Sequence, residues 1–278
     1  MKFTMLGTAA YERVPSMFCN CAVCRLATER RGKNLRADTQ ALIDDNILID
    51  IGLDSYHNFL KSGNDFATKL EHILITHNHI DHFFIEELKM KTNAYNAKGT
   101  NMNMTIYASA ECKEKYEKEA PNPALTFKVV KAYEEFKVGK YTVTALPAIH
   151  ARLDAFVYVI TDGSSTVFYS LDTEILSDDV YDFMNRRGFK IDAVFSDCCF
   201  GWLPVERPGT HMSLIGNLIH RDKLIEAGCV NANTKWYLTH FSHNGLFRDG
   251  VPMTHADMSR DARRHKMLVA YDGMKVEI

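Results

Sequence analysis

The sequence predicts a mixed α/β (α+β) fold in which two β-sheets pack face to face and helices cover the outside. Short apolar runs bounded by turn residues outnumber helical segments in each half of the chain, yet helices are interleaved throughout. That mixture is typical of layered sheets with helices outside. With 278 residues, 46% hydrophobic and 24% charged, the chain can bury a sizeable core. No linker or repeat interrupts it, so we expect one domain over residues 1–278.

The first half of the chain is expected to be rich in strands. Asp44-Asp45 is a turn between two apolar runs, so the runs on either side should form a hairpin. The expected strands are Lys2–Leu6, Ala41–Ile43, Asn46–Asp50, Leu70–Thr76, Met104–Ala108, Lys128–Lys131, Phe136–Val138 and Tyr141–Leu146. The expected helices are Leu53–Lys61, Ile85–Tyr95 and Glu111–Glu119.

The second half repeats this organisation. The turn-rich loop Asp162–Ser165 separates two strands that should pair, and Asp272-Gly273 should close a terminal hairpin. The expected strands are Ala155–Thr161, Thr166–Leu171, Ala193–Cys198, Lys235–Thr239, Met267–Tyr271 and Lys275–Ile278. The expected helices are Ser177–Gly188, Leu214–Ala227 and Ala256–Arg264.

The strongest chemical signal is an H-x-H-x-D-H pattern directly after the apolar run Ile73–Ile75, formed by His77, His79, Asp81 and His82. Imidazoles and a carboxylate suit zinc and its neighbours in the first transition row. Such a dense run can hold two metals instead of one. It therefore points to a hydrolase built around a metal-bound hydroxide.

Three more ligand-type residues stand where an expected strand ends: His150, Asp172 and His240. Strand ends on one edge of a sandwich point into a common cleft, where sites are commonly built. Each residue alone is a weak signal. Together with the histidine motif, they predict one metal-binding constellation.

Composition and charge narrow the class of partner. The net charge is −2, with no long run of one sign, which weighs against nucleic acid as the main partner. No apolar stretch approaches the length of a transmembrane helix, so we expect no membrane partner. The N-terminus has the pattern of a first strand more than of a signal peptide, which predicts a cytoplasmic protein.

Three of the seven cysteines, Cys19, Cys21 and Cys24, form a C-x-C-x-x-C cluster. In a reducing compartment such a cluster is typical of thiolates that bind a metal. Core thiols or a redox cluster are the alternatives. The other four cysteines have the pattern of small core residues, and they include the adjacent pair Cys198-Cys199.

In this order, the histidine motif, His150, Asp172 and His240 resemble the metallo-β-lactamase superfamily over nearly the whole chain. The resemblance implies a four-layer αββα sandwich with a dinuclear metal site on one edge. The ligands that it implies are His77, His79 and His150 for one metal, Asp81, His82 and His240 for the other, and Asp172 as the bridge. Members that open β-lactams typically have a cysteine at the bridging position, whereas an aspartate resembles the phosphodiesterase and glyoxalase-type branches.

The cysteine cluster, the segment Gly209–Ser213 and a histidine three residues after His240 are similar to the PhnP-type branch, the phosphoribosyl cyclic phosphate phosphodiesterases. That branch implies a closed structural zinc site, with the ligands Cys19, Cys21, Cys24 and His243. The chain departs from the branch at Asp197–Phe200, because the branch has a histidine after Asp-Cys-Ser. The loop that follows is therefore expected to shape the substrate pocket differently.

His211 lies beyond this ligand set, so it is better suited to donate a proton. The departing alkoxide of a phosphodiester needs one, and imidazole is well matched to that task near neutral pH. Asp81 is expected to orient the metal-bound hydroxide as well as to bind metal. The leading hypothesis is thus a phosphodiesterase for a small phosphodiester, with a cyclic ribosyl phosphate implied by the resemblance. Arg207, Arg248 and Lys61 would contact a second phosphate or be simply solvated.

Two alternatives stay open. The same dinuclear site could hydrolyse a thioester or lactone, for which no general acid is needed because a thiolate leaves readily. The chain could instead be a non-catalytic metal or redox sensor, with the cysteines as its functional centre. The expected cofactors are two zinc, manganese or iron ions at the active site and one structural zinc. The family analogy suggests a homodimer.

Overall fold

The computed structural model describes residues 1–278 except residues 64, 99, 120, 152 and 206–208. Its strands form two seven-stranded sheets and a small two-stranded sheet. The first large sheet has the order β16-β1-β2-β3-β4-β5-β6, antiparallel from β16 to β3 and parallel from β3 to β6. Its strands are β1 (Lys2–Gly7), β2 (Gln40–Ile43), β3 (Ile47–Ile49), β4 (His72–Leu74), β5 (Thr105–Ala108), β6 (Thr126–Val129) and β16 (Met274–Glu277).

The second large sheet has the order β15-β12-β11-β10-β9-β8-β7 and is mixed in the same way. It is parallel from β15 to β10 and antiparallel from β10 to β7. Its strands are β7 (Glu135–Val138), β8 (Tyr141–Pro147), β9 (Phe156–Thr161), β10 (Thr166–Ser170), β11 (Ala193–Asp197), β12 (Lys235–Thr239) and β15 (Leu268–Val269). The small sheet pairs β13 (Phe247–Arg248) with β14 (Val251–Pro252).

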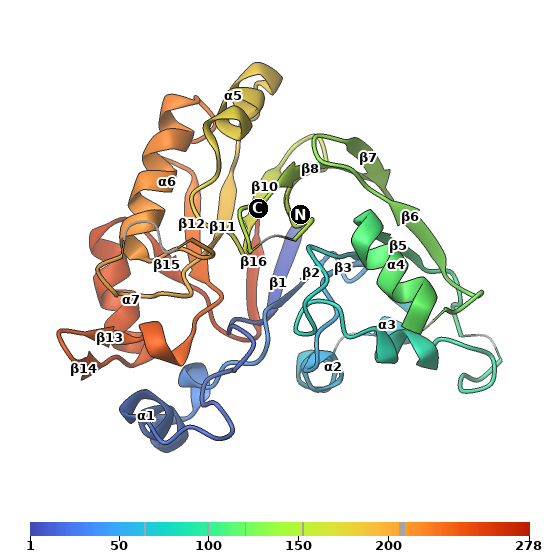
Figure 1. The fold of residues 1–278 in the computed structure, drawn as a ribbon, viewed down its shortest axis with the longest axis horizontal. Coiled ribbons are helices and arrows are strands. Elements are labelled where there is room, and N and C mark those ends of the chain that lie inside the picture. Colours follow the sequence, from blue (N-terminus) through green and yellow to red (C-terminus); the bar gives the residue numbers. More distant parts are fainter. Residues whose placement is uncertain (64, 99, 120, 152, 206–208) are drawn as a thin grey trace.

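Helices lie on both outer sides of the paired sheets (Figure 1). The α-helices are α1 (Ala22–Arg30), α2 (Ser55–Ser62), α3 (Phe66–Lys69), α4 (Ala110–Glu119), α5 (Asp178–Arg187), α6 (Leu214–Glu226) and α7 (His255–Arg264). The short 3₁₀ helices are η1 (Gly32–Asn34), η2 (Ile85–Met90) and η3 (His243–Gly245). Polar caps fix several starts: Ser213 caps α6, and Thr254 with Asp257 forms a capping box on α7.

Three buried clusters define the layers. The cluster between the sheets joins Phe3 of β1 to Phe195 of β11, whose stacked rings have centroids 4.2 Å apart. A second cluster packs the β7–β15 sheet against α5, α6 and α7, with Phe168, Leu224 and Met258 among its members. A third packs the other sheet against α4 and η2. Three apolar interfaces separate four layers, so the predicted αββα sandwich is confirmed.

Several local predictions were wrong. The two C-terminal strands do not form a hairpin, because β15 pairs with β12 in one sheet and β16 pairs with β1 in the other. Each strand thereby covers a free sheet edge, and the segment between them crosses from sheet to sheet. The helix expected over Ile85–Tyr95 is only the 3₁₀ helix η2. Helix α1 was not predicted from the sequence, because its N-cap residue is Cys21, an unusual capping residue.

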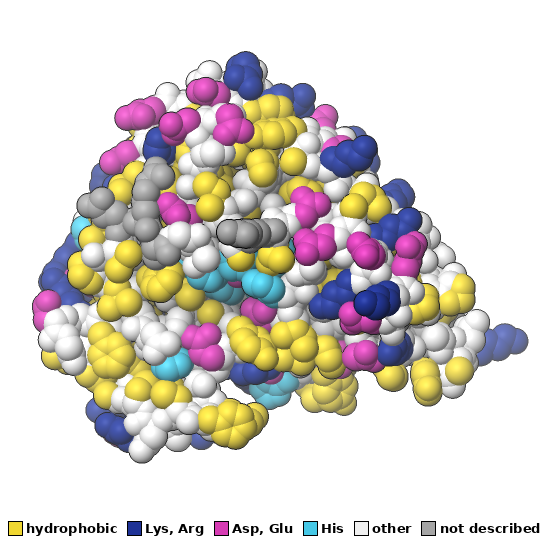
Figure 2. All heavy atoms as spheres, viewed as in Figure 1, with side chains coloured by type: hydrophobic (Ala, Val, Ile, Leu, Met, Phe, Trp, Pro, Cys, Tyr) yellow, Lys and Arg dark blue, Asp and Glu magenta, His cyan; other side chains and the backbone are white. Residues whose placement is uncertain are grey.

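The fold gathers the ends of several strands at one edge. Segments that follow β4, β8, β10 and β12 carry the histidines and aspartates of the predicted constellation. Charged side chains of both signs are intermixed on the face drawn in Figure 2, and histidines gather near its middle. Among the described residues, no helix is both long enough and apolar enough to cross a membrane.

Candidate metal centre

The structure brings the seven predicted ligands together around the carboxylate of Asp172. Its Oδ1 lies 3.1 Å from Nε2 of His240 and 3.7 Å from Nε2 of His150. Its Oδ2 lies 3.2 Å from Nε2 of His82, which is itself 3.1 Å from Oδ2 of Asp81. Nε2 of His150 is 3.2 Å from Nδ1 of His79.

Two groups of donor atoms within this cluster have metal-binding spacing. The donor atoms of His77, His79 and His150 all lie within 4.8 Å of one another, as do those of His77, His82 and Asp172. His77 is common to these two groups, and Asp172 also belongs to a group with Asp197, His211 and His240. The short distances from Asp172 to His82, His150 and His240 place it between the two ligand sets that the family resemblance implies. The binding of metal by each residue stays a prediction.

Three buried polar atoms in this cluster have no hydrogen-bond partner: Nε2 of His77, Nε2 of His82 and Oδ2 of Asp172. Their side chains are almost fully buried. An unsatisfied buried polar atom costs free energy, and a bound cation would remove that cost. Imidazole and carboxylate donors at this spacing fit a divalent transition metal.

The opposite nitrogen of each buried histidine is held by a neighbour. Nδ1 of His82 lies 2.8 Å from Oδ2 of Asp50, and Nδ1 of His77 lies 3.0 Å from Oγ1 of Thr76. Nδ1 of His150 contacts the carbonyl oxygen of Thr210 at 3.1 Å, and Nδ1 of His240 contacts Oγ1 of Thr39 at 3.1 Å. Such partners fix the orientation and tautomer of a metal-binding imidazole. None of these supporting residues was predicted from the sequence: Asp50, Thr210 and Thr39 lie far in sequence from the histidines that they contact, whereas Thr76 directly precedes His77.

The backbone is strained at the same place. Asp50, Asp172 and His240 have φ angles of 65°, 50° and 60°, in the left-handed region. Residues other than glycine seldom adopt this conformation, and such strain is often concentrated at functional sites. Asp50 and His240 directly follow a strand and Asp172 lies two residues after β10, so the chain turns sharply at each and directs the side chain into the centre.

The surroundings favour the neutral imidazole at His77 and His79 but the protonated imidazole at His82. Burial and neighbouring imidazoles lower the pKa of His77 well below its usual value, and that of His79 also falls. Burial alone would lower the pKa of His82 as well, but the surrounding carboxylates of Asp172, Asp81 and Asp50 raise it. A divalent cation bound here would supply the positive charge that these carboxylates otherwise gain from a proton on His82.

A cavity of about 380 Å³ opens beside the centre. Its lining includes five of the predicted ligands and His211. Tyr11, Glu12, Ile80 and Cys199 also line it, although the sequence analysis did not assign them to the site. Glu12 accepts a hydrogen bond from Ser242, which holds its carboxylate in place.

His211 is anchored from behind by Asp197, the last residue of β11. The Nδ1 atom of His211 lies 2.8 Å from Oδ2 of Asp197, so Nε2 is the nitrogen available to a ligand in the cavity. Burial alone would lower the pKa of His211, but the charge and hydrogen bond of Asp197 raise it to about 9.

The cysteine cluster forms a second, separate donor set. The donor atoms of Cys19, Cys21, Cys24 and His243 all lie within 4.8 Å of one another. Nδ1 of His243 is 3.5 Å from Sγ of Cys21 and 3.9 Å from Sγ of Cys19. A tetrahedral zinc with usual bond lengths would separate sulfur and nitrogen ligands by about 3.5 Å. The four side chains therefore fit a closed zinc site.

Two elements build this second donor set. Cys21 caps helix α1, where the backbone N–H of Cys24 donates to its sulfur. Burial raises the pKa of Cys21, but hydrogen bonds, chiefly from Cys24, lower it to about 7. His243 opens the 3₁₀ helix η3, three residues after His240. One short segment thus serves both donor sets.

The residues considered for a second phosphate do not join the centre. Lys61 lines a different cavity, and Arg248 pairs with Asp261. Arg207 lies outside the described residues.

Known proteins with similar sequences or structures support the fold described above. A family model described as "Beta-lactamase superfamily domain" matches residues 45–241. A diphosphatase from the PhnP family is 20% identical with a TM-score of 0.75, and the match covers 100% of this chain and 97% of the other. Zn(2+)-bound PqqB from Methylobacterium extorquens is 14% identical with a TM-score of 0.75 and complete coverage of both chains. Human tRNase Z, short form, is 16% identical with a TM-score of 0.66, covering 100% and 99% of the two chains.

One curated relative matches part of the chain. An octanoyltransferase from Porphyromonas gingivalis is 28% identical over 173 residues, which is 58% of this chain. The match covers 33% of that relative, so the chain spans about a third of its length. Because the family model covers well over half of the chain, the predicted family is confirmed: the protein belongs to the metallo-β-lactamase superfamily of metal-dependent hydrolases and has PhnP-like relatives.

Proposed function

We propose that the protein is a dinuclear-metal-dependent phosphodiesterase that hydrolyses a small phosphodiester, of which a cyclic ribosyl phosphate is one member. One observation carries this proposal. A histidine that belongs to neither implied ligand set, His211, lines the same cavity as the bridging Asp172 and is held there by Asp197. A phosphodiesterase needs both a cation cluster and a proton donor, whereas thioester hydrolysis needs only the first.

The proposed ligands are His77, His79 and His150 for one cation, Asp81, His82 and His240 for the other, and Asp172 between them. Two divalent cations held there would neutralise the phosphate and lower the pKa of the attacking water. A separate structural zinc is proposed at Cys19, Cys21, Cys24 and His243, where all donors come from the protein.

The protein groups then position the reactants. Asp81 accepts a hydrogen bond from the attacking water and directs its lone pair at phosphorus. The P–O bond to the leaving group breaks as the new P–O bond forms in line with it. Nε2 of His211 gives its proton to the departing oxygen, while Asp197 keeps the ring oriented through Nδ1.

The size of the cavity favours a small substrate. A volume of about 380 Å³ is near the lower end of the range usual for small-molecule sites, and is too small for a folded nucleic acid. The name of the PhnP-family relative, a diphosphatase, supports chemistry at a phosphate.

The test compares two phosphodiesters that differ only in the leaving group, an alkyl alcohol or nitrophenol. A nitrophenolate leaves without a proton, so His211→Ala should slow cleavage of the alkyl ester by about 100-fold or more and the nitrophenyl ester much less. Absence of metal-dependent cleavage of either ester contradicts the proposal.

The same preparation separates the alternatives. Full activity of His211→Ala toward a thioester, with no phosphodiesterase activity in the unsubstituted protein, favours the thioesterase. One thiol-bound metal per chain with an empty histidine site favours the sensor. Three metals per chain, one of which resists chelators, favours the proposed enzyme.

A further inference from the structure

A second cavity, of about 450 Å³, lies between helices α6 and α7 beside strand β12. Trp236, the second residue of β12, forms part of its wall. His240 of the metal centre directly follows the other end of the same strand. The two cavities therefore lie at opposite ends of β12, and their linings share no described residue.

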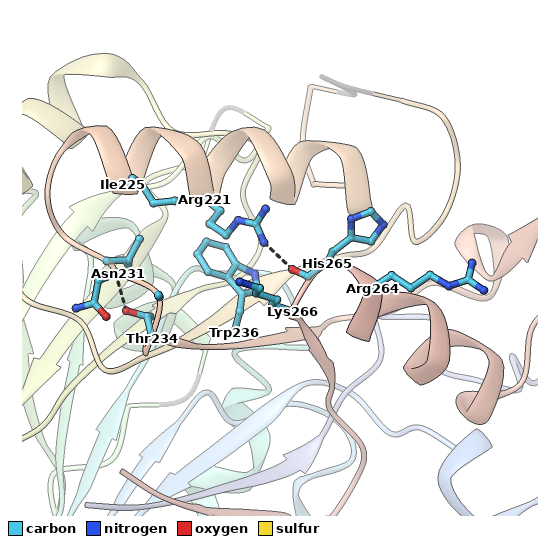
Figure 3. A pocket seen from close by; sticks show the side chains of 10 residues that line it. Arg221, Ile225, Asn231, Thr234, Trp236, Arg264, His265 and Lys266 are labelled. Atoms are coloured by element: carbon cyan, nitrogen blue, oxygen red, sulfur yellow. Dashed lines mark hydrogen bonds between the residues drawn. The ribbon is translucent and has the colours of Figure 1, made fainter.

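Cations are concentrated at the α7 end of this cavity. Arg221 comes from α6, and Arg264, His265 and Lys266 come from the end of α7 and the loop after it. The described lining contains no aspartate or glutamate. Figure 3 shows the guanidinium of Arg221 directed at His265, whose carbonyl oxygen it donates to at 2.6 Å. This hydrogen bond holds the positively charged guanidinium of Arg221 beside the cavity.

Two of these cations can meet a ligand. Lys266 is exposed and has no ion-pair partner among the described residues. Arg221 keeps its guanidinium at the cavity, whereas Figure 3 shows the side chain of Arg264 extending away from Trp236, and Arg264 pairs with Asp261 at 3.0 Å. Because the pocket offers positive charge without a lining carboxylate, it favours an anion.

The opposite end of the cavity is mostly apolar. Ile225 is 50% exposed there, and Val230 and the indole of Trp236 continue the wall. Figure 3 shows Ile225 and Asn231 at this end, away from the cations. A half-exposed isoleucine beside a tryptophan gains from covering by an apolar group. The cavity therefore offers one apolar end and one cationic end.

We propose that this cavity binds a small organic anion, a phosphate or carboxylate carried on an apolar body, and acts as an effector site for the metal centre. The anionic group contacts Lys266 and Arg221, and the apolar body lies against Ile225 and Trp236. A volume of about 450 Å³ is large enough for such a molecule.

A continuous chain of hydrogen bonds connects the two sites. Nε1 of Trp236 donates to Oδ1 of Asn217 at 3.1 Å, and Nδ2 of Asn217 donates to the carbonyl oxygen of Asp197 at 2.6 Å. The carboxylate of Asp197 holds His211 at 2.8 Å. A ligand that shifts the indole therefore acts on the residue that orients the proposed proton donor. This effect on catalysis rests on the proposed function, whereas binding does not.

Binding is tested by tryptophan fluorescence of the full chain, because Trp236 lines this cavity and no tryptophan is among the described residues of the metal cavity. Phenyl phosphate and octanoate distinguish the two anionic groups, and inorganic phosphate lacks the apolar body. The double variant Arg221→Gln/Lys266→Gln should bind the better probe at least tenfold more weakly. Arg30→Gln/Lys89→Gln, which removes the same charge elsewhere, should bind it unchanged.

Equal affinity in the two double variants, or no response to either organic probe, overturns the site. Lys266→Gln, which keeps the bond from Arg221 to His265, provides a second variant, and thermal melting checks that each variant folds. A response to inorganic phosphate as strong as to phenyl phosphate also overturns the proposal, because the apolar end would then have no role.

The coupling is tested with octanoate present during phosphodiester hydrolysis. The rate should change at least twofold in the unsubstituted protein and remain unchanged in Trp236→Phe, which keeps an aromatic wall but loses the donor to Asn217. Calorimetry should show that Trp236→Phe still binds octanoate. Binding without any rate change overturns the coupling alone. If the protein cleaves no phosphodiester, the proposed function fails while the fluorescence result still decides the binding site.

Discussion

The Nδ1 atom of His211 lies 2.8 Å from Oδ2 of Asp197, and that carboxylate also supports the proposed metal bridge. Its Oδ2 accepts the backbone N–H of Asp172 at 3.1 Å. Its Oδ1 accepts the N–H groups of Cys199 and Met212 at 2.9 and 3.0 Å. A single buried side chain thus positions both the proposed bridging residue and the proposed proton donor.

Asp197→Asn should lower kcat by about 100-fold on an alkyl phosphodiester, because an amide nitrogen cannot accept from these donors. Steady-state kinetics measure the loss. Asp192→Asn is the matched control, since Asp192 directly precedes the same strand and its carboxylate accepts only the backbone N–H of Thr166 among the described contacts. An unchanged kcat in Asp197→Asn would show that the carboxylate has no positioning role.

Cys21→Ser should remove one metal per chain and leave the other metals bound, because Cys21 belongs only to the cysteine donor set. Loss of a structural zinc also lowers the melting temperature, by roughly 2–4 °C for each kcal/mol lost. Elemental analysis and thermal melting provide the two readouts. Cys229→Ala removes a thiol outside the set and should keep the full metal content; equal metal content in both variants would contradict the zinc site.

Glu12→Gln should tighten binding of a phosphodiester while kcat stays nearly constant. The Glu12 carboxylate lines the cavity and is held by Ser242, so it repels an anionic substrate without taking part in bond breaking. Removing about 1 kcal/mol of repulsion lowers KM roughly fivefold. Glu29→Gln, on the exposed face of α1, is the charge control. A large fall in kcat with constant KM would assign Glu12 to the chemistry instead.

His220 should make the protein less stable in mild acid. It is a fully buried residue of α6, and burial lowers its pKa to about 3 from the usual 6.5. Below pH 6.5 the unfolded chain binds a proton that the folded chain does not, so stability falls as the pH drops from 6.5 toward 3.

Chemical denaturation between pH 7.5 and 5.5 measures this slope. Because His220→Gln does not titrate, its free energy of unfolding should depend less on pH than that of the unsubstituted protein. The metal ligands are the same in both proteins, so their titration cancels in the comparison. Identical slopes would contradict the assignment to His220.

The layers and the ligand segments could be predicted because each rests on a local pattern. Short apolar runs bounded by turn residues mark the strands, and the motif from His77 to His82 is contiguous in sequence. The residues that orient the histidines could not be predicted. Thr39 and Asp50 contact His240 and His82 only because the fold brings together segments that are distant in sequence. The positive φ angles of Asp172 and His240 could not be predicted either, because neither residue type indicates this backbone conformation.

The terminal strands show the same limit. Met267–Tyr271 and Lys275–Ile278 have the local pattern of a hairpin, but the free edges of β12 and β1 bind them separately. The turn residue Asp272 accepts hydrogen bonds from Thr8 and Ala37, each at 2.7 Å, so it supports the crossing between the sheets. Tertiary pairing therefore overrides a plausible local turn.

Metal titration is a direct test of the proposal that two cations at the histidine centre make this protein a phosphodiesterase. Chelator-treated protein that retains its structural zinc is titrated with manganese or zinc while hydrolysis of a nitrophenyl phosphodiester is followed. Activity should rise until two further equivalents of metal are bound, and Asp172→Ala should show no such rise. Binding of both equivalents with no phosphodiester hydrolysis at any occupancy would contradict it.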